Sequence, residues 1–225
     1  MQRATAHQVN FLPWPGFWHK LVSADVFVAC VGFKYTPRGY ENRVRMRDTG
    51  DWATVPVRRT RGRSYDVEIA DRFAVAQIAR RIDHWSRQRS YRHRDRLEPV
   101  IDYLRNSSET HLYRLNLRLI EIVLDILGHR DTEIRLDLTD RTGVPIENSI
   151  ADIVTGNGEI YLSGSSGPEY ANRNAMVGIQ EVYVQDLPSG IASESVLHLI
   201  AECDDPLSKI RELGHWRIWC GKDVA

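Results

Sequence analysis

His7 and Asn10 place two side chains typical of reaction centres near the start of the chain. A neutral imidazole accepts protons near neutral pH, so His7 is the candidate general base. Gln8, Asn10 and Trp14 follow it closely and are candidate substrate-binding residues. Sequence position alone favours the alternative that His7 is a buried histidine bonded to the backbone. The reactive interpretation gains support because loop residues on a rigid scaffold often carry function.

A basic, aromatic-rich segment at residues 33–43 is the candidate anion-binding element. A guanidinium group binds two oxygens at once, and a lysine adds a mobile point charge. Aromatic rings in the same segment would cover a base or a sugar ring. An equal alternative is a solvated basic loop that its aromatic residues anchor to the core. The residues expected to bind a phosphate or a carboxylate are Lys34, Arg38, Asn42 and Arg43.

A run of small residues at 163–167 offers backbone donors. Its glycines would let N–H groups approach a phosphate or an oxyanion, so Ser163 and Ser165 are candidate binding residues. The run lacks the Gly-Lys-Ser/Thr ending of a P-loop and the Gly-x-Ser-x-Gly elbow of hydrolases, which leaves a plain turn as the alternative. Tyr170, just beyond, is expected either to bond a ligand or to pack.

The elements that must position these residues alternate between strands and helices. Residues 5–10 and 25–31 read as strands that flank a helix at about 16–23, and the second strand is almost continuously apolar. This alternation predicts a Rossmann-like α/β fold, with a mainly parallel sheet and helices on both faces. Further strands are predicted at 52–57, 65–69, 132–138, 159–162 and 182–186, with a loop and helix at 142–154 and a further helix at 194–202.

The middle of the chain, at about 73–128, changes to helical spacing and ends at Gly128, a plausible helix cap. At 225 residues the chain has room for one substantial core. We therefore expect a single α/β domain over residues 1–225, with a helical layer or insertion in the middle.

Parallel strands end at a shared edge of their sheet, so the loops after the first, second and late strands should gather there. His7 and Asn10, residues 34–43 and residues 163–170 are therefore expected to line one pocket. His19, on the first helix, is expected at the surface, since polar residues on a helix are usually solvated.

Composition excludes several classes of protein. Formal net charge is zero and the pI is about 7.1, so we do not expect a nucleic-acid-binding protein. No segment has the length of a membrane span, and the start lacks a signal-peptide pattern, so we expect a cytoplasmic chain without membrane attachment.

The metal-ligating residue types show no metal-binding spacing. Three cysteines lack CxxC spacing, and the histidines of the helical middle lack the i, i+4 spacing of a zinc helix, so no metal site is expected. The cysteines are Cys30, Cys203 and Cys220, and the histidines are His84, His93, His111 and His129.

Several segments together resemble the WbqC-like protein family, bacterial proteins often encoded among genes for surface polysaccharides and, in some cases, specialised metabolites. The resemblance lies in the opening segment, an Ala-Asp-Val-Phe-Val strand, the basic loop, a Trp-x-Thr-Val-Pro-Val strand and a late strand with a Ser-Gly loop. These occupy residues 7–20, 24–28, 33–43, 52–57 and 160–170. The family usually has Pro where this chain has Val9, and an acidic residue after the second strand where this chain has Cys30-Val31-Gly32.

The resemblance and the polar strand-end cluster together predict a biosynthetic transferase or ligase-like enzyme. It would move an acyl or aminoacyl group onto an amine of a small molecule or sugar. His7 would be the base, Asn10 would orient the substrate, and the donor's phosphate or carboxylate would bind to Lys34, Arg38 and Arg43. The expected partner is an anionic small-molecule or carrier-bound substrate. The sequence names no cofactor and leaves a homo-oligomer open.

Two alternatives remain at this point. One is a non-catalytic binding protein that presents a nucleotide-linked or carrier-bound intermediate to a partner enzyme. The other is nucleotidyl transfer, because the turn at residues 13–16 before a helix resembles that of nucleotidylyltransferases.

Overall fold

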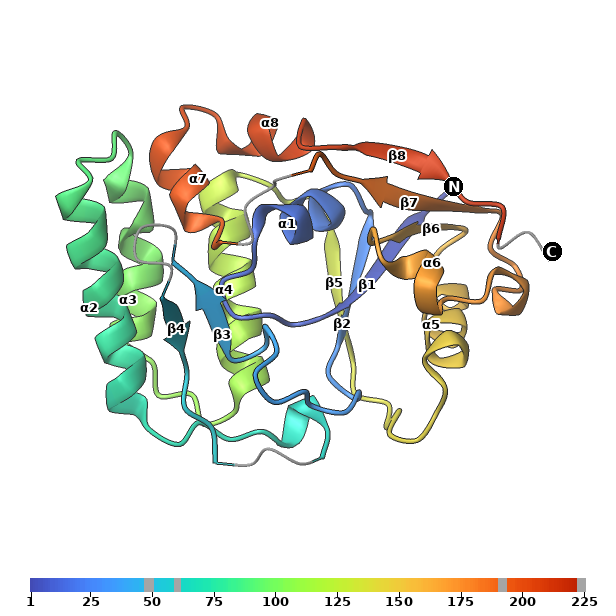
Figure 1. The fold of residues 1–225 in the computed structure, drawn as a ribbon, viewed down its shortest axis with the longest axis horizontal. Helices are drawn as coiled ribbons and strands as arrows, with labels where there is room; N and C mark the ends of the chain where they lie inside the picture. Colours follow the sequence, from blue (N-terminus) through green and yellow to red (C-terminus); the bar gives the residue numbers. More distant parts are fainter. Residues whose placement is uncertain (47–50, 59–61, 190–193, 222–225) are drawn as a thin grey trace.

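A six-stranded sheet organises the chain (Figure 1). The structure is a computed structural model that describes residues 1–46, 51–58, 62–189 and 194–221. The sheet has the order β5-β2-β1-β6-β7-β8, in which only the last pair is antiparallel. This is the predicted mainly parallel α/β sheet of Rossmann-like type. Its strands are β1 (Arg3–Gln8), β2 (Val26–Cys30), β5 (Glu133–Asp137), β6 (Ile160–Ser163), β7 (Glu181–Asp186) and β8 (His215–Ile218).

The opening β1-α1-β2 unit forms as predicted. β1 and β2 are parallel, from Ala4 opposite Val26 to Gln8 opposite Cys30, and α1 (Pro15–Val22) connects them. Proline suits the first turn of α1 because the N–H that it lacks would have no partner inside the helix. All five residues of β2 are buried, as expected for a strand that helices cover on both faces.

Helices cover both faces of the sheet. On one face Ile153, from α5 (Ile146–Thr155), packs in a cluster with Ala6 and Val28. On the other face Phe27 of β2 packs against Phe17 of α1, within the largest core cluster of the described chain. The same cluster contains residues of α4 (Leu112–Leu127), so the helical layer and the sheet share one core.

The helical middle consists of α2 (Arg72–Gln88), α3 (Glu98–Asn106) and α4, with short 3-10 turns η1 (Ser64–Asp66) and η2 (Arg94–Leu97) before α2 and α3. Asp71 caps α2 by accepting a hydrogen bond from the backbone N–H of Phe73. Gly128 ends α4 with a φ of 66°, the left-handed conformation that glycine adopts without steric cost. The predicted glycine cap is confirmed.

The prediction of a strand at residues 65–69 is wrong. Part of this segment forms η1, and its later backbone groups bond to the start of the helical layer: Leu112 N–H donates to Val67, and Ile69 N–H donates to Thr110. The end of the segment also forms an isolated antiparallel bridge between Ile69 and Val57, so it lies between the chain after β4 and the start of the helical layer. The predicted strand at 52–57 is shorter, and β4 (Trp52–Thr54) pairs with β3 (Arg43–Arg45) outside the main sheet.

The last part of the chain contains elements that the hydrophobic pattern did not indicate. They are β8, α8 (Pro206–Arg211), the one-turn helix α6 (Gly167–Tyr170) and the 3-10 turn η3 (Arg173–Ala175). The helix predicted at 194–202 is confirmed over α7 (Leu197–Glu202). β8 has mostly exposed side chains, as an edge strand does, and therefore carries little periodicity. Among the described helices, none combines the length and apolarity needed to cross a bilayer.

Candidate functional site

The centre of the sheet has a topological switch point at the carboxyl end of β1. The chain passes from β1 to β2 on one side and later returns to place β6 on the other side. β1 and β6 pair only at Arg3 and Ala4, and beyond these residues the ladder ends. In open α/β sheets, ligands bind where the strand order reverses in this way.

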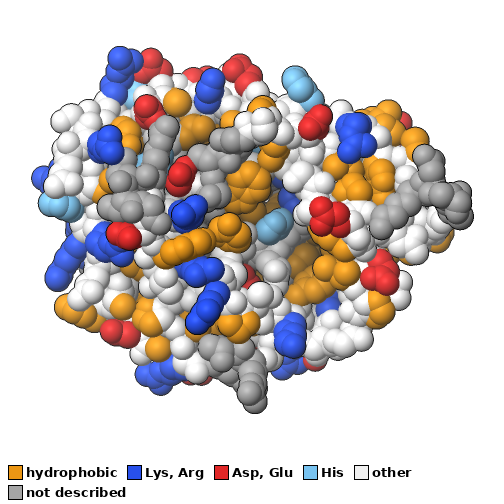
Figure 2. Space-filling model, in the orientation of Figure 1, with side chains coloured by type: hydrophobic (Ala, Val, Ile, Leu, Met, Phe, Trp, Pro, Cys, Tyr) orange, Lys and Arg blue, Asp and Glu red, His pale blue; other side chains and the backbone are white. Residues whose placement is uncertain are grey.

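A cavity of about 340 Å³ lies at this end of the sheet. One side comes from the ends of β1 and β2 and the loop after β2, and the other side comes from the β5-α5 loop, α5 and α6. Figure 2 shows a hollow near the middle of one face, where a histidine lies beside hydrophobic side chains. The lining consists of Ala6, His7, Gln8, Cys30, Phe33, Lys34, Thr36, Arg141, Thr142, Gly143, Val144, Ile146, Ile150 and Tyr170.

His7 is held in one orientation at the cavity. Its Nδ1 lies 2.8 Å from the carbonyl oxygen of Gln8, and since that oxygen only accepts, Nδ1 carries the proton. Nε2 is therefore the proton acceptor. The ring also packs edge-on against Phe17, with centroids 5.1 Å apart. Burial, followed by the charge of Lys20, lowers the pKa of His7 to about 3, so its imidazole is neutral and weakly basic.

Gln8 connects the cavity to a buried carboxyl group. Its Nε2 donates to Oε1 of Glu41 at 3.4 Å. Burial raises the pKa of Glu41 to about 7. The buried side chain of Asn116, on α4, donates from Nδ2 to the backbone carbonyls of Val9 and Glu41 at 2.8 and 2.7 Å. The helical layer thus supports the loop that follows β1.

Lys20, which the sequence did not single out, lies outside the cavity lining but contacts Ala6, which is part of that lining. Its side chain extends from α1, is 4% exposed, and donates from Nζ to the carbonyl oxygen of Ala6 at 3.0 Å. No carboxylate among the described residues pairs with it. Burial lowers its pKa to about 8. The sequence of α1 did not indicate that Lys20 is buried, because its burial depends on how the distant strand β6 separates from β1.

Cys30 lines the cavity as a buried thiol. Its Sγ donates to the carbonyl of Val28 at 3.4 Å, and burial raises its pKa to about 12. The thiol is protonated at neutral pH, whereas the thiolate is the reactive form. Cys30 therefore acts as a small apolar residue of the cavity floor.

Arg141, which the sequence did not single out, has its charge neutralised. Its side chain is 7% exposed, and it donates to Asp137 at 2.8 Å and to Asp152 at 2.9 Å. These bonds fix the β5-α5 loop that forms one side of the cavity. Lys34 is instead an exposed cation in the lining, placed to meet an anionic ligand.

The structure brings together only some of the predicted site residues. His7, Gln8, Lys34 and Tyr170 line the cavity. Asn10 is buried beyond the end of β1, Trp14 is half-buried, and Ser163 is buried at the end of β6, all outside the lining. The exposed side chain of Ser165 also lies outside it.

The later part of the basic loop also lies outside the lining. Arg38 is exposed, with a φ of 63°. Asn42 is buried and donates from Nδ2 to the carbonyl of Val55 at 3.0 Å. Arg43 stacks over Trp52, with its guanidinium carbon 4.0 Å from the ring centroid. Asn42 and Arg43 thus contact β4 and the segment after it.

The prediction that His19 lies at the surface is wrong. Its side chain is 1% exposed, its Nδ1 lies 2.7 Å from Nε2 of Gln185, and its ring stacks on Trp216. The unforeseen β8 supplies Trp216 and covers this side of α1. Burial lowers the pKa of His19.

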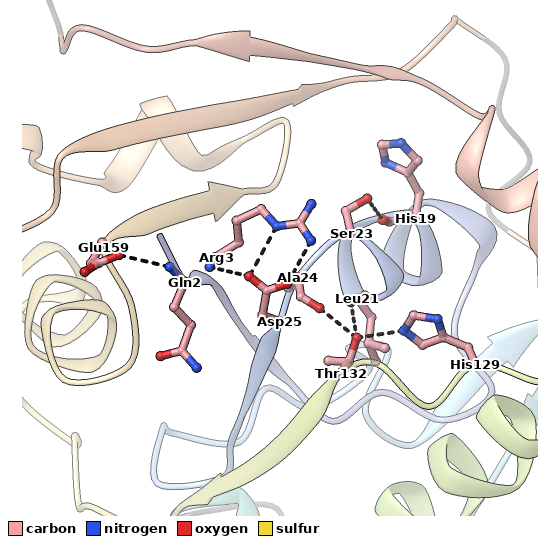
Figure 3. Close-up of polar contacts among 10 residues, drawn as sticks. All are labelled: Gln2, Arg3, His19, Leu21, Ser23, Ala24, Asp25, His129, Thr132 and Glu159. Carbon is pink, nitrogen blue, oxygen red and sulfur yellow. Dashed lines mark hydrogen bonds and ion pairs between the residues drawn. The ribbon is translucent and has the colours of Figure 1, made fainter.

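Polar contacts connect neighbouring strands at their amino ends, away from the cavity (Figure 3). Arg3 forms an ion pair with Asp25 at 2.7 Å, and Thr132 donates to the carbonyl of Ala24 at 2.7 Å. These contacts join the starts of β1, β2 and β5, so they hold the strands whose far ends carry the site. Within the described chain, no group of three or more metal-ligating side chains is arranged to hold a metal ion.

Comparison with known proteins identifies the family. The profile of the WbqC-like protein family matches residues 8–186, which include the cavity residues from Gln8 to Tyr170. The Uncharacterized protein Rv1507c of Mycobacterium tuberculosis is 26% identical over 135 residues, which span 57% of this chain and 57% of that relative. No solved structure is significantly similar. The chain therefore belongs to the WbqC-like protein family.

Proposed function

We propose that this protein is a biosynthetic transferase or ligase-like enzyme that moves an acyl or aminoacyl group onto an amine of a small molecule or sugar. The pathway would make surface polysaccharides or specialised metabolites. The observation that carries the proposal is the orientation of His7. Its bond to the Gln8 carbonyl leaves Nε2 as a proton acceptor at a cavity next to the sheet's switch point.

The cavity suits an activated acyl donor. Val144 and Ile146 give it an apolar side for an acyl chain, and Lys34 gives it a cation for the donor's phosphate or carboxylate. The amine nitrogen attacks the donor carbonyl and forms a C–N bond. Its proton passes to Nε2 of His7, and the leaving group departs with the electron pair of the broken bond.

The low basicity of His7 limits which proton it can take. An imidazole with a pKa of about 3 does not deprotonate a free ammonium ion. An amine that has attacked a carbonyl is far more acidic, so a weak, oriented base suffices at that stage. The acceptor would enter as the free amine. Transfer would be direct, because the protonated thiol of Cys30 does not form an acyl intermediate.

The same low basicity favours a second candidate, a non-catalytic protein that presents a nucleotide-linked or carrier-bound intermediate to a partner enzyme. Here His7 would bond the ligand through Nε2 without taking a proton. The two functions predict the same contacts and differ only in turnover.

A His7→Gln variant separates the two candidates. The protein would be incubated with acyl-coenzyme A, acyl-adenylate and aminoacyl-tRNA donors, together with amine acceptors, and amide formation followed by mass spectrometry. Transfer by the native protein that falls at least 100-fold in His7→Gln, with donor binding retained, supports the enzyme. His84→Gln, an exposed histidine on α2, is the matched control.

Donor binding without transfer by the native protein would support the presenting protein instead. Release of pyrophosphate from nucleoside triphosphates and acid substrates would contradict both and indicate nucleotidyl transfer.

A further inference from the structure

A buried ammonium group, that of Lys20, lies where the strand ladder between β1 and β6 ends. Thr5 still reaches across, donating from Oγ1 to the carbonyl of Leu162 at 2.7 Å. One residue later no β6 partner is present, and the carbonyl of Ala6 accepts from Nζ of Lys20. Lys20 thus lies at the switch point itself, reached from the α1 side.

The space beside this ammonium is open. A Cβ atom built on Gly164, just after β6, would have only Nζ of Lys20 within 4 Å, at 4.0 Å. A Cβ on the neighbouring Gly167 would instead collide with Oγ of Ser163. The loop after β6 is therefore packed at Gly167 and unfilled at Gly164, on the side that faces Lys20.

A purely structural role does not account for a cation at this position. The carbonyl of Ala6 needs one donor, which a neutral side chain or a water molecule can supply. An ammonium group carries three donors, and one acceptor for them is found among the described residues. Burial of an unpaired charge costs several kcal/mol, a cost that a bound anion would offset.

We propose that Lys20 Nζ, together with the open space beside Gly164, forms an anion-binding subsite for a phosphate or carboxylate group of the ligand. For its place in catalysis this inference rests on the proposed function. It assigns the anion to the switch point beside Ala6 and close to the neutral His7, whereas the basic loop contributes Lys34 to the cavity lining. The donor's charged group would then lie within the sheet's switch point, and its reactive carbonyl would face the cavity.

Lysine NMR can test the subsite directly, because the chain has four lysines, at positions 20, 34, 209 and 222. The full chain, labelled with ¹³C at lysine Cε, would be titrated with inorganic phosphate and, separately, with acetate. We expect a saturable shift of the Lys20 resonance and a rise in its pKa, with phosphate, acetate or both. Which ion acts tells a phosphate ligand from a carboxylate ligand. No response of Lys20 to either ion would overturn the proposal.

A variant pair provides the second measurement. Lys20→Met should lose the rise in melting temperature that the active ion produces and bind that ion at least tenfold more weakly. Lys209→Met, at an exposed position on α8, should behave as the native protein does. Full anion stabilisation in Lys20→Met would contradict the subsite. His7→Gln should keep the anion response, so a failure of acyl transfer is distinguishable from a failure of anion binding.

Discussion

Gln8 Nε2 lies 3.4 Å from Oε1 of Glu41, so an amide that lines the cavity is bonded to a carboxyl group buried behind it. The pKa of Glu41 is raised to about 7 by burial, and the folded protein therefore binds a proton that the unfolded chain releases near pH 4.5. Stability contributed by this proton is present below pH 4.5 and is lost as the pH rises toward 7.

Glu41→Gln should remove this loss of stability at higher pH. At pH 7.5 we expect the free energy of unfolding of the variant to exceed that of the native protein by up to about 3 kcal/mol. The difference should shrink toward pH 4.5. Urea denaturation between pH 4.5 and 7.5 measures it, with Glu169→Gln, an exposed glutamate, as the control. A difference that does not change with pH would show that Glu41 is ionised in the native state.

His7 should make the protein sensitive to acid. Its pKa is lowered from 6.5 to about 3, so the unfolded chain binds a proton in that range and the folded protein does not. Stability contributed by His7 is therefore present above pH 6.5 and is lost as the pH falls toward 3. His7→Gln should flatten the stability curve between pH 6.5 and 4, as measured by urea denaturation. An unchanged slope would mean that His7 accepts a proton in the folded state.

Lys20 should make the stability of the protein depend on pH in the alkaline range. Its pKa falls from 10.5 to about 8, so between these values the unfolded chain holds a proton that the folded protein has released, and native stability rises with pH. The charged form below pH 8 is destabilising by an order of 3 kcal/mol. Cys30 and His7 are the titratable groups that interact with it.

Lys20→Met should consequently be at least as stable as the native protein at pH 7. Relief of the buried charge offsets the unpaired carbonyl of Ala6, which costs about 1–3 kcal/mol. The advantage of the variant should disappear between pH 8 and 10. Denaturation curves of both proteins at pH 7, 8, 9 and 10 measure the change. A variant that is much less stable at every pH would instead assign Lys20 a structural role.

Asn116 should support the site from a distance. Its Nδ2 donates to two buried carbonyls, and replacement by the similarly sized leucine leaves both unpaired. We expect Asn116→Leu to lower the free energy of unfolding by about 2–4 kcal/mol. Asn148→Leu, on an exposed position of α5, should change it little. Equal stability of the two variants would contradict the role of Asn116.

The sequence was most informative about elements with a strong pattern. The almost continuous apolar run of β2 and the proline-glycine pair at the start of α1 predicted the first unit and its parallel pairing. The burial of Lys20 and His19 was not predictable, because each depends on a distant strand. Lys20 is enclosed where β6 departs from β1, and His19 is covered by Trp216 of the weakly patterned β8.

Charge in the basic loop was misleading for a different reason. An arginine can bind a ligand or stack on a neighbouring ring, and composition does not distinguish the two. Arg43 stacks on Trp52 across the β3-β4 pair, whereas the acidic Glu41 beside it bonds to a cavity residue. Of the four residues predicted in the basic loop, only Lys34 lines the cavity.

The cavity is assembled from two distant stretches of the chain. One side of its lining comes from residues 6–36, and the opposite side comes from residues 141–170. A ligand held there would span the first and second halves of the protein and act as a clamp between them. Such a clamp opposes partial opening of the sheet along β1 and β6, the pair with the shortest parallel ladder. Ligand binding at the cavity and local opening of the sheet between β1 and β6 are thus thermodynamically linked.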